Sequence, residues 1–124
     1  MSTRTSTKRT TKKAQKKEKN KLQDRVLSLL GLATRARKCV SGEFSAEQAI
    51  KEGQAQLVII ASDASDNTKK HFYDMCNYRN IPVYTYSTRE GLGKCTGKAA
   101  RASVAVTDQG FSEKIRSILQ EVNI

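Results

Sequence analysis

Hydrophobic residues begin to recur at regular spacing once the chain passes Lys21. One face of a helix repeats every three or four residues. The first residues with this spacing are Leu22, Val26, Leu29, Leu30 and Ala33. They predict a helix over residues 21–37. Comparable patterns predict further helices over residues 42–53, 66–78 and 87–95, and a last helix after Asp108.

Short apolar segments between these helices are typical of strands. The run from Leu57 to Ala61 is wholly apolar and bounded by turn formers, which indicates a strand covered on both faces. Strands are also expected over residues 82–86 and 102–106, and Pro82 suits a strand start because its missing N–H is harmless there. The alternation predicts an α/β protein, a three-layer α/β/α sandwich with a small sheet of about four short strands.

Polar residues mark several expected helix starts. Ser87 and Glu90 have the S-x-x-E spacing of a capping box, so Ser87 is expected to begin the helix over residues 87–95. Asp108 is expected to cap the last helix. Asp63 and Asp66 follow a predicted strand, and we interpret both as helix caps rather than as catalytic carboxylates.

Basic residues are concentrated at the N-terminus. Residues 1–21 contain nine Lys or Arg and one Glu, within a chain whose net charge is +11. Residues 1–20 have too few apolar side chains to offset the entropy of ordering, so we expect a disordered basic tail there and one folded domain over residues 21–124. The tail is either a solubilising segment or an arm that binds polyphosphate without sequence preference. The charge favours a polyanionic partner.

Cysteine usage and hydropathy limit the compartment and the chemistry. The three cysteines are widely spaced and form no C-x-x-C pair, which is typical of reduced thiols in a cytosolic protein. No apolar run approaches the length of a membrane span, and the N-terminus lacks the apolar segment of a signal peptide. With one histidine and no clustered ligands, we expect no metal site. The sequence predicts a cytoplasmic protein with no cofactor and no membrane partner.

The stretch GLGKCTGKAARASVAV, residues 91–106, has the glycines of a nucleotide-binding loop but not their spacing. In the P-loop pattern Leu92 stands where the first glycine is required, and Ala99 replaces the hydroxyl. The dinucleotide fingerprint fails at Thr96 and does not open a long helix directly after a strand. Nothing indicates that His71 lies beside a cysteine nucleophile. We therefore expect no catalysis.

Four blocks of sequence carry a family resemblance. They are GLATRARKCVSGE, LVIIASDASDNTKK, IPVYTY and LGKCTGKAARASVAVTDQGF. In this order and at these intervals they resemble the ribosomal protein L7Ae family of kink-turn RNA binders, most of all its bacterial YlxQ-type branch, over about residues 22–115. The resemblance implies an α/β/α fold with a mixed sheet. It also implies a small, monomeric RNA-binding protein without enzymatic activity, whose partners are ribosomal RNA or another structured RNA and the ribosome.

The resemblance also implies where RNA binds. In the family, RNA contacts the start of the second helix and the loop before the last strand, with the turn after the central strand alongside. A helix N-terminus suits phosphate because it presents free N–H groups and partial positive charge, and Gly42 allows close approach of RNA backbone. Nearby cations lower the cost of bringing phosphates together. The expected RNA-binding residues are Arg35, Arg37, Lys38, Gly42, Glu43, Phe44, Ser45, Gln48, Asp63, Lys98, Ala99 and Arg101.

The chain departs from the family pattern at the start of the second helix. The kink-turn readers of the family carry an Asn-Glu pair there and a Lys one turn later, whereas this chain has Phe44-Ser45 and Gln48. Phe44 either stacks on an unpaired base or belongs to the core. Ser45 and Gln48 can still hydrogen-bond to RNA, but without charge. A variant turn or a ribosomal RNA junction is therefore also a candidate target.

Two other functions stay open on the sequence alone. The same fold occurs as the substrate-binding domain of some RNA 2′-O-methyltransferases, so the chain can act with an RNA-modifying enzyme that supplies the catalytic domain. Alternatively, the last helix, from Phe111 to Leu119, can form a surface for another protein.

Overall fold

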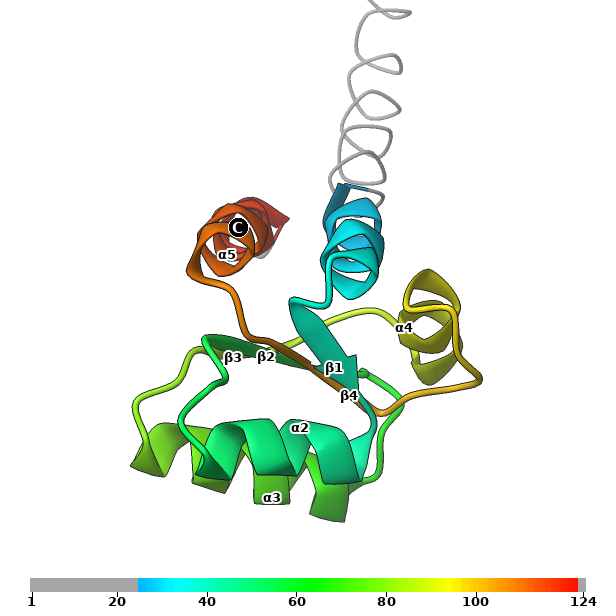
Figure 1. Cartoon of the computed structure of the whole chain (residues 1–124). Coiled ribbons are helices and arrows are strands. Elements are labelled where there is room, and N and C mark those ends of the chain that lie inside the picture. The colour runs from blue at the N-terminus through cyan, green and yellow to red at the C-terminus, as the bar shows by residue number, and fades with distance from the viewer. Residues whose placement is uncertain (1–24, 123–124) are drawn as a thin grey trace, which may run out of the picture.

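The computed structural model describes residues 25–122 and has three layers (Figure 1). Besides a helix over residues 25–35, the elements are β1 (Cys39–Ser41), α2 (Glu43–Lys51), β2 (Leu57–Ile60), α3 (Asp66–Tyr78), β3 (Val83–Thr85), α4 (Arg89–Cys95), β4 (Ser103–Val106) and α5 (Gln109–Val122). The sheet is the middle layer. Helices α2 and α3 cover one face, and the helix over residues 25–35 lies between α4 and α5 on the other (Figure 1). The predicted α/β/α sandwich is confirmed.

The sheet order explains how distant segments of the chain meet. The strands lie in the order β1-β4-β2-β3; β4 is antiparallel to both of its neighbours, and β2 is parallel to β3. The ends of β1, β2 and β3 and the start of β4 therefore share one edge of the sheet. This edge carries the start of α2, the turn after β2, the start of α4 and the loop that leads into β4.

The core follows the predicted hydrophobic pattern. All four residues of β2 are buried, as expected for a strand covered on both faces. The helices contribute the apolar faces that their spacing predicted. Their largest buried side chains include Val26, Leu30, Ile50, Phe72, Leu92, Ile115 and Leu119.

The structure differs from the sequence-based expectations mainly at short elements. Strand β1 was not predicted, because three residues offer too little periodicity to recognise; it is held by antiparallel pairing with β4. The cap of α4 is Thr88 rather than Ser87, and its Oγ1 accepts a hydrogen bond from Gly91 N at 3.0 Å. Asp108 caps α5 as predicted, since its Oδ2 accepts from Phe111 N at 2.8 Å.

Two further expectations concern the N-terminal tail and the absence of a membrane span. The basic tail expected over residues 1–20 lies outside the described residues. Within residues 25–122, no helix has the length and apolar character needed to cross a bilayer.

Candidate nucleic-acid interface

A hollow lies at the sheet edge where α2 begins and β4 begins. We call it the α2–β4 hollow, and it is lined by Ser41, Gly42, Glu43, Phe44, Ser45, Arg89, Ala100, Arg101 and Ala102. The two segments expected to bind RNA, about sixty residues apart in the sequence, thus line one concave surface.

Gly42 lies against Arg101, and this pair links the two segments. Gly42 has φ 97° and ψ 155°, a conformation almost restricted to glycine, and its N–H donates to Ser103 O at 2.8 Å. A Cβ at this position would lie 3.6 Å from both Cδ and Nε of Arg101, so the arginine side chain crosses directly over the glycine. Gly42 also lacks a side chain that could accept from the first-turn N–H groups of α2, which leaves them available to a ligand.

Arg89 is a residue of the hollow that the sequence analysis missed. Asp63 holds it from the turn after β2: Oδ1 accepts from Arg89 N at 2.8 Å, and Oδ2 lies 3.7 Å from Arg89 Nε. Arg89 O in turn accepts from Arg101 N at 2.9 Å. The expectation that Asp63 and Asp66 cap the helix that follows them is wrong, because Ser65 is the cap of α3. Asp63 instead accepts a hydrogen bond from the first N–H of α4, the helix that Thr88 caps. Hydrogen bonds thus join the turn after β2, the start of α4 and the loop before β4.

Phe44 is on the surface, with 76% of its area exposed. The interpretation of Phe44 as a core residue is therefore wrong. Phe44 lines the α2–β4 hollow together with Arg89 and Arg101. Gln48 lies one turn later on the same face of α2, and Ser45 and Gln48 are both exposed. These three side chains are available to a ligand.

Glu43 is exposed, but its carboxylate has a partner in the protein. Oε1 accepts a hydrogen bond from Thr68 Oγ1 at 3.1 Å, and Thr68 Oγ1 accepts from Ser65 Oγ at 2.9 Å. Ser65 is the cap of α3. Glu43 thus ties the start of α2 to the start of α3, a positioning role within the protein.

The loop over residues 97–101 lies against α4. Gly97 directly follows Thr96, the C-cap of α4, and has φ 72°. The next residue, Lys98, donates its N–H to Gly93 O at 2.8 Å. A Cβ at Gly93 would overlap the carbonyl oxygen of Ala99, so only glycine allows this close approach. Lys98 and Ala99 are exposed at the tip of the loop. The glycines therefore shape a surface loop, as predicted.

The three basic residues that precede β1 do not join the α2–β4 hollow. Lys38 O accepts from Thr107 N, at the end of the β1–β4 ladder opposite to Gly42 and Ser103. At about 3.3 Å per residue, four residues of strand separate Lys38 from Gly42 by roughly 13 Å. Arg37 directly precedes Lys38 and has φ 61°. Arg35 lies in a separate groove beside α4.

The thiols and the histidine do not have the surroundings of a nucleophile and its base. Burial raises the pKa of the Cys39 and Cys76 thiols to about 11, whereas a reactive cysteine needs a lowered pKa. Burial also raises the pKa of Cys95. His71 Nε2 lies 3.4 Å from Glu47 Oε1, on the outer surface of α2 and α3. The α2–β4 hollow offers cations, N–H groups and an aromatic ring, which are binding groups.

The fold and the hollow together define an L7Ae-like α/β/α protein. The chain belongs to the ribosomal protein L7Ae/L30e/S12e/Gadd45 family, whose model matches residues 24–116. It is 50% identical over 91 residues to the RNA-binding protein YlxQ of Bacillus subtilis, covering 73% of this chain and 91% of that protein. It is 31% identical over 98 residues to the YlxQ protein of Enterococcus faecium, covering 79% and 94%. The expected family and its YlxQ-type branch are thereby confirmed.

Solved structures agree with this assignment. A Bacillus halodurans protein of unknown function matches with a TM-score of 0.74 and 43% identity, covering 77% of this chain and 96% of that one. The Giardia lamblia 15.5kD RNA binding protein matches with a TM-score of 0.69 and 20% identity, covering 83% and 88%. The second likeness establishes the shared fold. The curated relatives are named for RNA binding and not for an enzymatic activity, in line with the expectation that the chain is not an enzyme.

Proposed function

We propose that this chain is a small RNA-binding protein that holds a sharply bent or looped RNA, of the kink-turn kind, in the α2–β4 hollow. Its RNA is ribosomal or another structured RNA, and the protein works in association with the ribosome. The observation that carries the proposal is the contact between Gly42 and Arg101. A Cβ at Gly42 would lie 3.6 Å from the Arg101 side chain, so the helix start and the basic loop are close enough to contact one ligand together.

The phosphate-binding groups of the hollow come from three segments. Arg101 projects over Gly42, Arg89 is held by Asp63, and the first-turn N–H groups of α2 face the same space. A sharply bent RNA brings phosphates of two helices close together, and converging cations lower the repulsion between them. Lys98 adds an exposed charge on the loop. This arrangement favours a bent RNA over a straight duplex.

Phe44 supplies the group that distinguishes bases from backbone. An exposed phenyl ring in a hollow that is also lined by two arginines is suited to stack on a base that has left its helix. Ser45 and Gln48, on the exposed side of α2, can donate and accept hydrogen bonds at base edges. With these residues in place of Asn-Glu and Lys, an unpaired nucleotide contributes more to recognition than the edges of paired bases.

The proposal is tested by measuring binding to a kink-turn RNA and to a plain duplex at several salt concentrations. Wild type should prefer the bent RNA. Arg101→Ala should weaken binding and make the salt dependence shallower by about one unit in log K against log salt, as expected for one lost phosphate contact.

Arg116→Ala is the matched control. Arg116 is also an exposed arginine, but it lies with Gln56 and Asn80 at the opposite edge of the sheet. It should leave both the affinity and the salt dependence unchanged. Equal affinity of the wild-type protein for bent and straight RNA would contradict the proposed specificity. An Arg101→Ala variant that behaves like Arg116→Ala would contradict the proposed site.

A further inference from the structure

A second groove runs between the helix over residues 25–35 and α4, on the face of the sheet opposite to α2 and α3. Its lining includes Leu27, Leu32, Arg35, Lys94 and Cys95. We call it the α4 groove. Leu32 has 48% of its area exposed, so its side chain contributes apolar surface to the groove. The groove therefore combines an apolar surface with two exposed cations.

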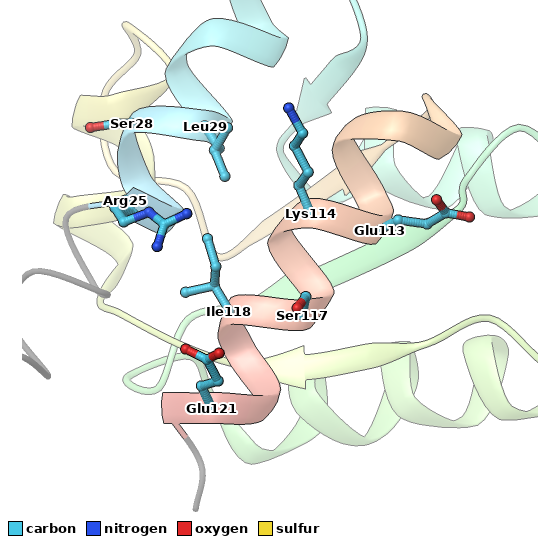
Figure 2. A pocket seen from close by; sticks show the side chains of 8 residues that line it. All are labelled: Arg25, Ser28, Leu29, Glu113, Lys114, Ser117, Ile118 and Glu121. Carbon is cyan, nitrogen blue, oxygen red and sulfur yellow. The ribbon is translucent and has the colours of Figure 1, made fainter.

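The charge of the α4 groove is of one sign. Arg35 and Lys94 line it, no Asp or Glu does, and neither cation is in an ion pair within residues 25–122. The groove on the other side of the same helix provides a comparison. It is bordered by Arg25 and Lys114 but also by Glu113 and Glu121 (Figure 2). Of these two grooves beside the first helix, the α4 groove is the one that offers a polyanion two cations without carboxylates in its lining.

The α4 groove continues from the α2–β4 hollow along a single helix. Arg89, the first residue of α4, lines the hollow, and Gly91 and Lys94 line the groove. Five residues of helix rise about 7.5 Å and turn by about 140°, so a strand leaving the hollow reaches the groove by passing around α4 within a few nucleotides.

The two helices that form the α4 groove are held close together. A Cβ at Gly31 would lie 3.0 Å from Cys95 O, so the first helix packs directly against the end of α4. The apolar surface between them is therefore preformed. Proteins that hold unpaired nucleotides place cations along the phosphates and an apolar surface, usually aromatic, under the bases. In the α4 groove the aliphatic side chains of Leu27 and Leu32 supply the apolar surface.

We infer that the α4 groove binds a single-stranded RNA segment that continues from the bent RNA, with Arg35 and Lys94 on its phosphates and Leu27 and Leu32 under a base. The inference rests on the proposed function, because the α2–β4 hollow must position the RNA. The protein would then recognise a bend together with its unpaired flank.

The test compares one bent RNA with versions that carry a few unpaired uridines at the 5′ end or at the 3′ end of either strand. Full-length protein should bind one extended version about tenfold more tightly than the blunt RNA, as expected for two added phosphate contacts and one base packed on an apolar surface. Arg35→Ala combined with Lys94→Ala should abolish this gain and leave affinity for the blunt RNA unchanged.

The control is Arg25→Ala combined with Lys114→Ala, which removes an arginine and a lysine from the groove of Figure 2. It should keep the full gain. A gain that persists in the Arg35 and Lys94 variant, or that is lost equally in the control, overturns the inference. The absence of any gain with tight binding of the blunt RNA overturns it as well, while the proposed function stands. Failure to bind any bent RNA overturns the proposed function.

Discussion

At the residue scale, Phe44 is the side chain whose position changes the functional interpretation most. It has 76% of its area exposed and borders the α2–β4 hollow, where an apolar ring has no packing role. We expect Phe44→Ala to weaken binding of bent RNA by about 1–3 kcal/mol, the typical contribution of one base stacked on an aromatic ring. The free energy of unfolding should change by less than about 0.5 kcal/mol because the ring is exposed. Equilibrium binding and urea unfolding of the same variant check the two expectations.

Tyr78 provides the control for a lost exposed ring. It has 83% of its area exposed, stacks against the Arg79 guanidinium, and lies at the end of α3 away from the hollow. Tyr78→Ala should leave RNA affinity unchanged, and Phe44→Trp should retain binding. A Phe44→Ala protein with full affinity would exclude base stacking at this position.

The sequence identified most residues of the hollow but not Arg89. Gly42, Arg101 and Asp63 belong to segments that carry the family resemblance. Arg89 lies at a helix start that the sequence predicted one residue too early, and its role depends on Asp63 reaching across from another loop. Such a contact follows from the order of the strands, which the spacing of hydrophobic residues does not specify. Lys38 lies away from Gly42, although the two are close in sequence, because the extended strand β1 separates them.

At the element scale, α4 determines the shape of the loop over residues 97–101. Gly93→Ala adds a methyl group that overlaps Ala99 O, so the loop must move away from the helix. Alanine favours a helix over glycine by about 1 kcal/mol, but overpacking costs typically 1–3 kcal/mol. Since the methyl group here meets backbone rather than a flexible side chain, we expect net destabilisation by about 1–2 kcal/mol in urea unfolding, within that range. RNA binding should weaken too, because Lys98 and Arg101 move with the loop.

Gly53→Ala is the control, because it replaces a glycine without moving the loop over residues 97–101. Gly53 follows α2, has φ 74°, and has open space where a Cβ would lie. Its replacement should cost about 1 kcal/mol of backbone strain and leave RNA affinity unchanged. If Gly93→Ala were as stable as wild type and bound RNA equally well, the loop would not depend on close packing against α4.

Element prediction succeeded where apolar residues recur and failed where an element is held only by its neighbours. The strand at 57–61 and the helices with buried faces were recognisable because burial on a sheet requires that spacing. Strand β1 has three residues, and its register against β4 comes from pairing with residues more than sixty positions away. Its position nevertheless decides which basic residues reach the hollow.

At the scale of the whole molecule, we propose that the basic N-terminal segment and the folded domain contribute separately to RNA binding. Residues 1–20 contain eight Lys or Arg and one Glu, or +7 of the net +11. Charge in such a segment binds phosphate without regard to RNA shape, whereas the α2–β4 hollow has a fixed geometry. A chain lacking residues 1–20 should therefore bind plain duplex more weakly, and the slope of log K against log salt should be shallower by several units.

The preference of this shortened chain for bent over straight RNA should be as large as that of the full chain or larger, because the shared non-specific contribution is gone. Titrations of both RNAs with both proteins, between about 50 and 200 mM salt, measure the two quantities together. Should the shortened chain bind both RNAs equally well, shape recognition would belong to the N-terminal segment and not to the folded domain.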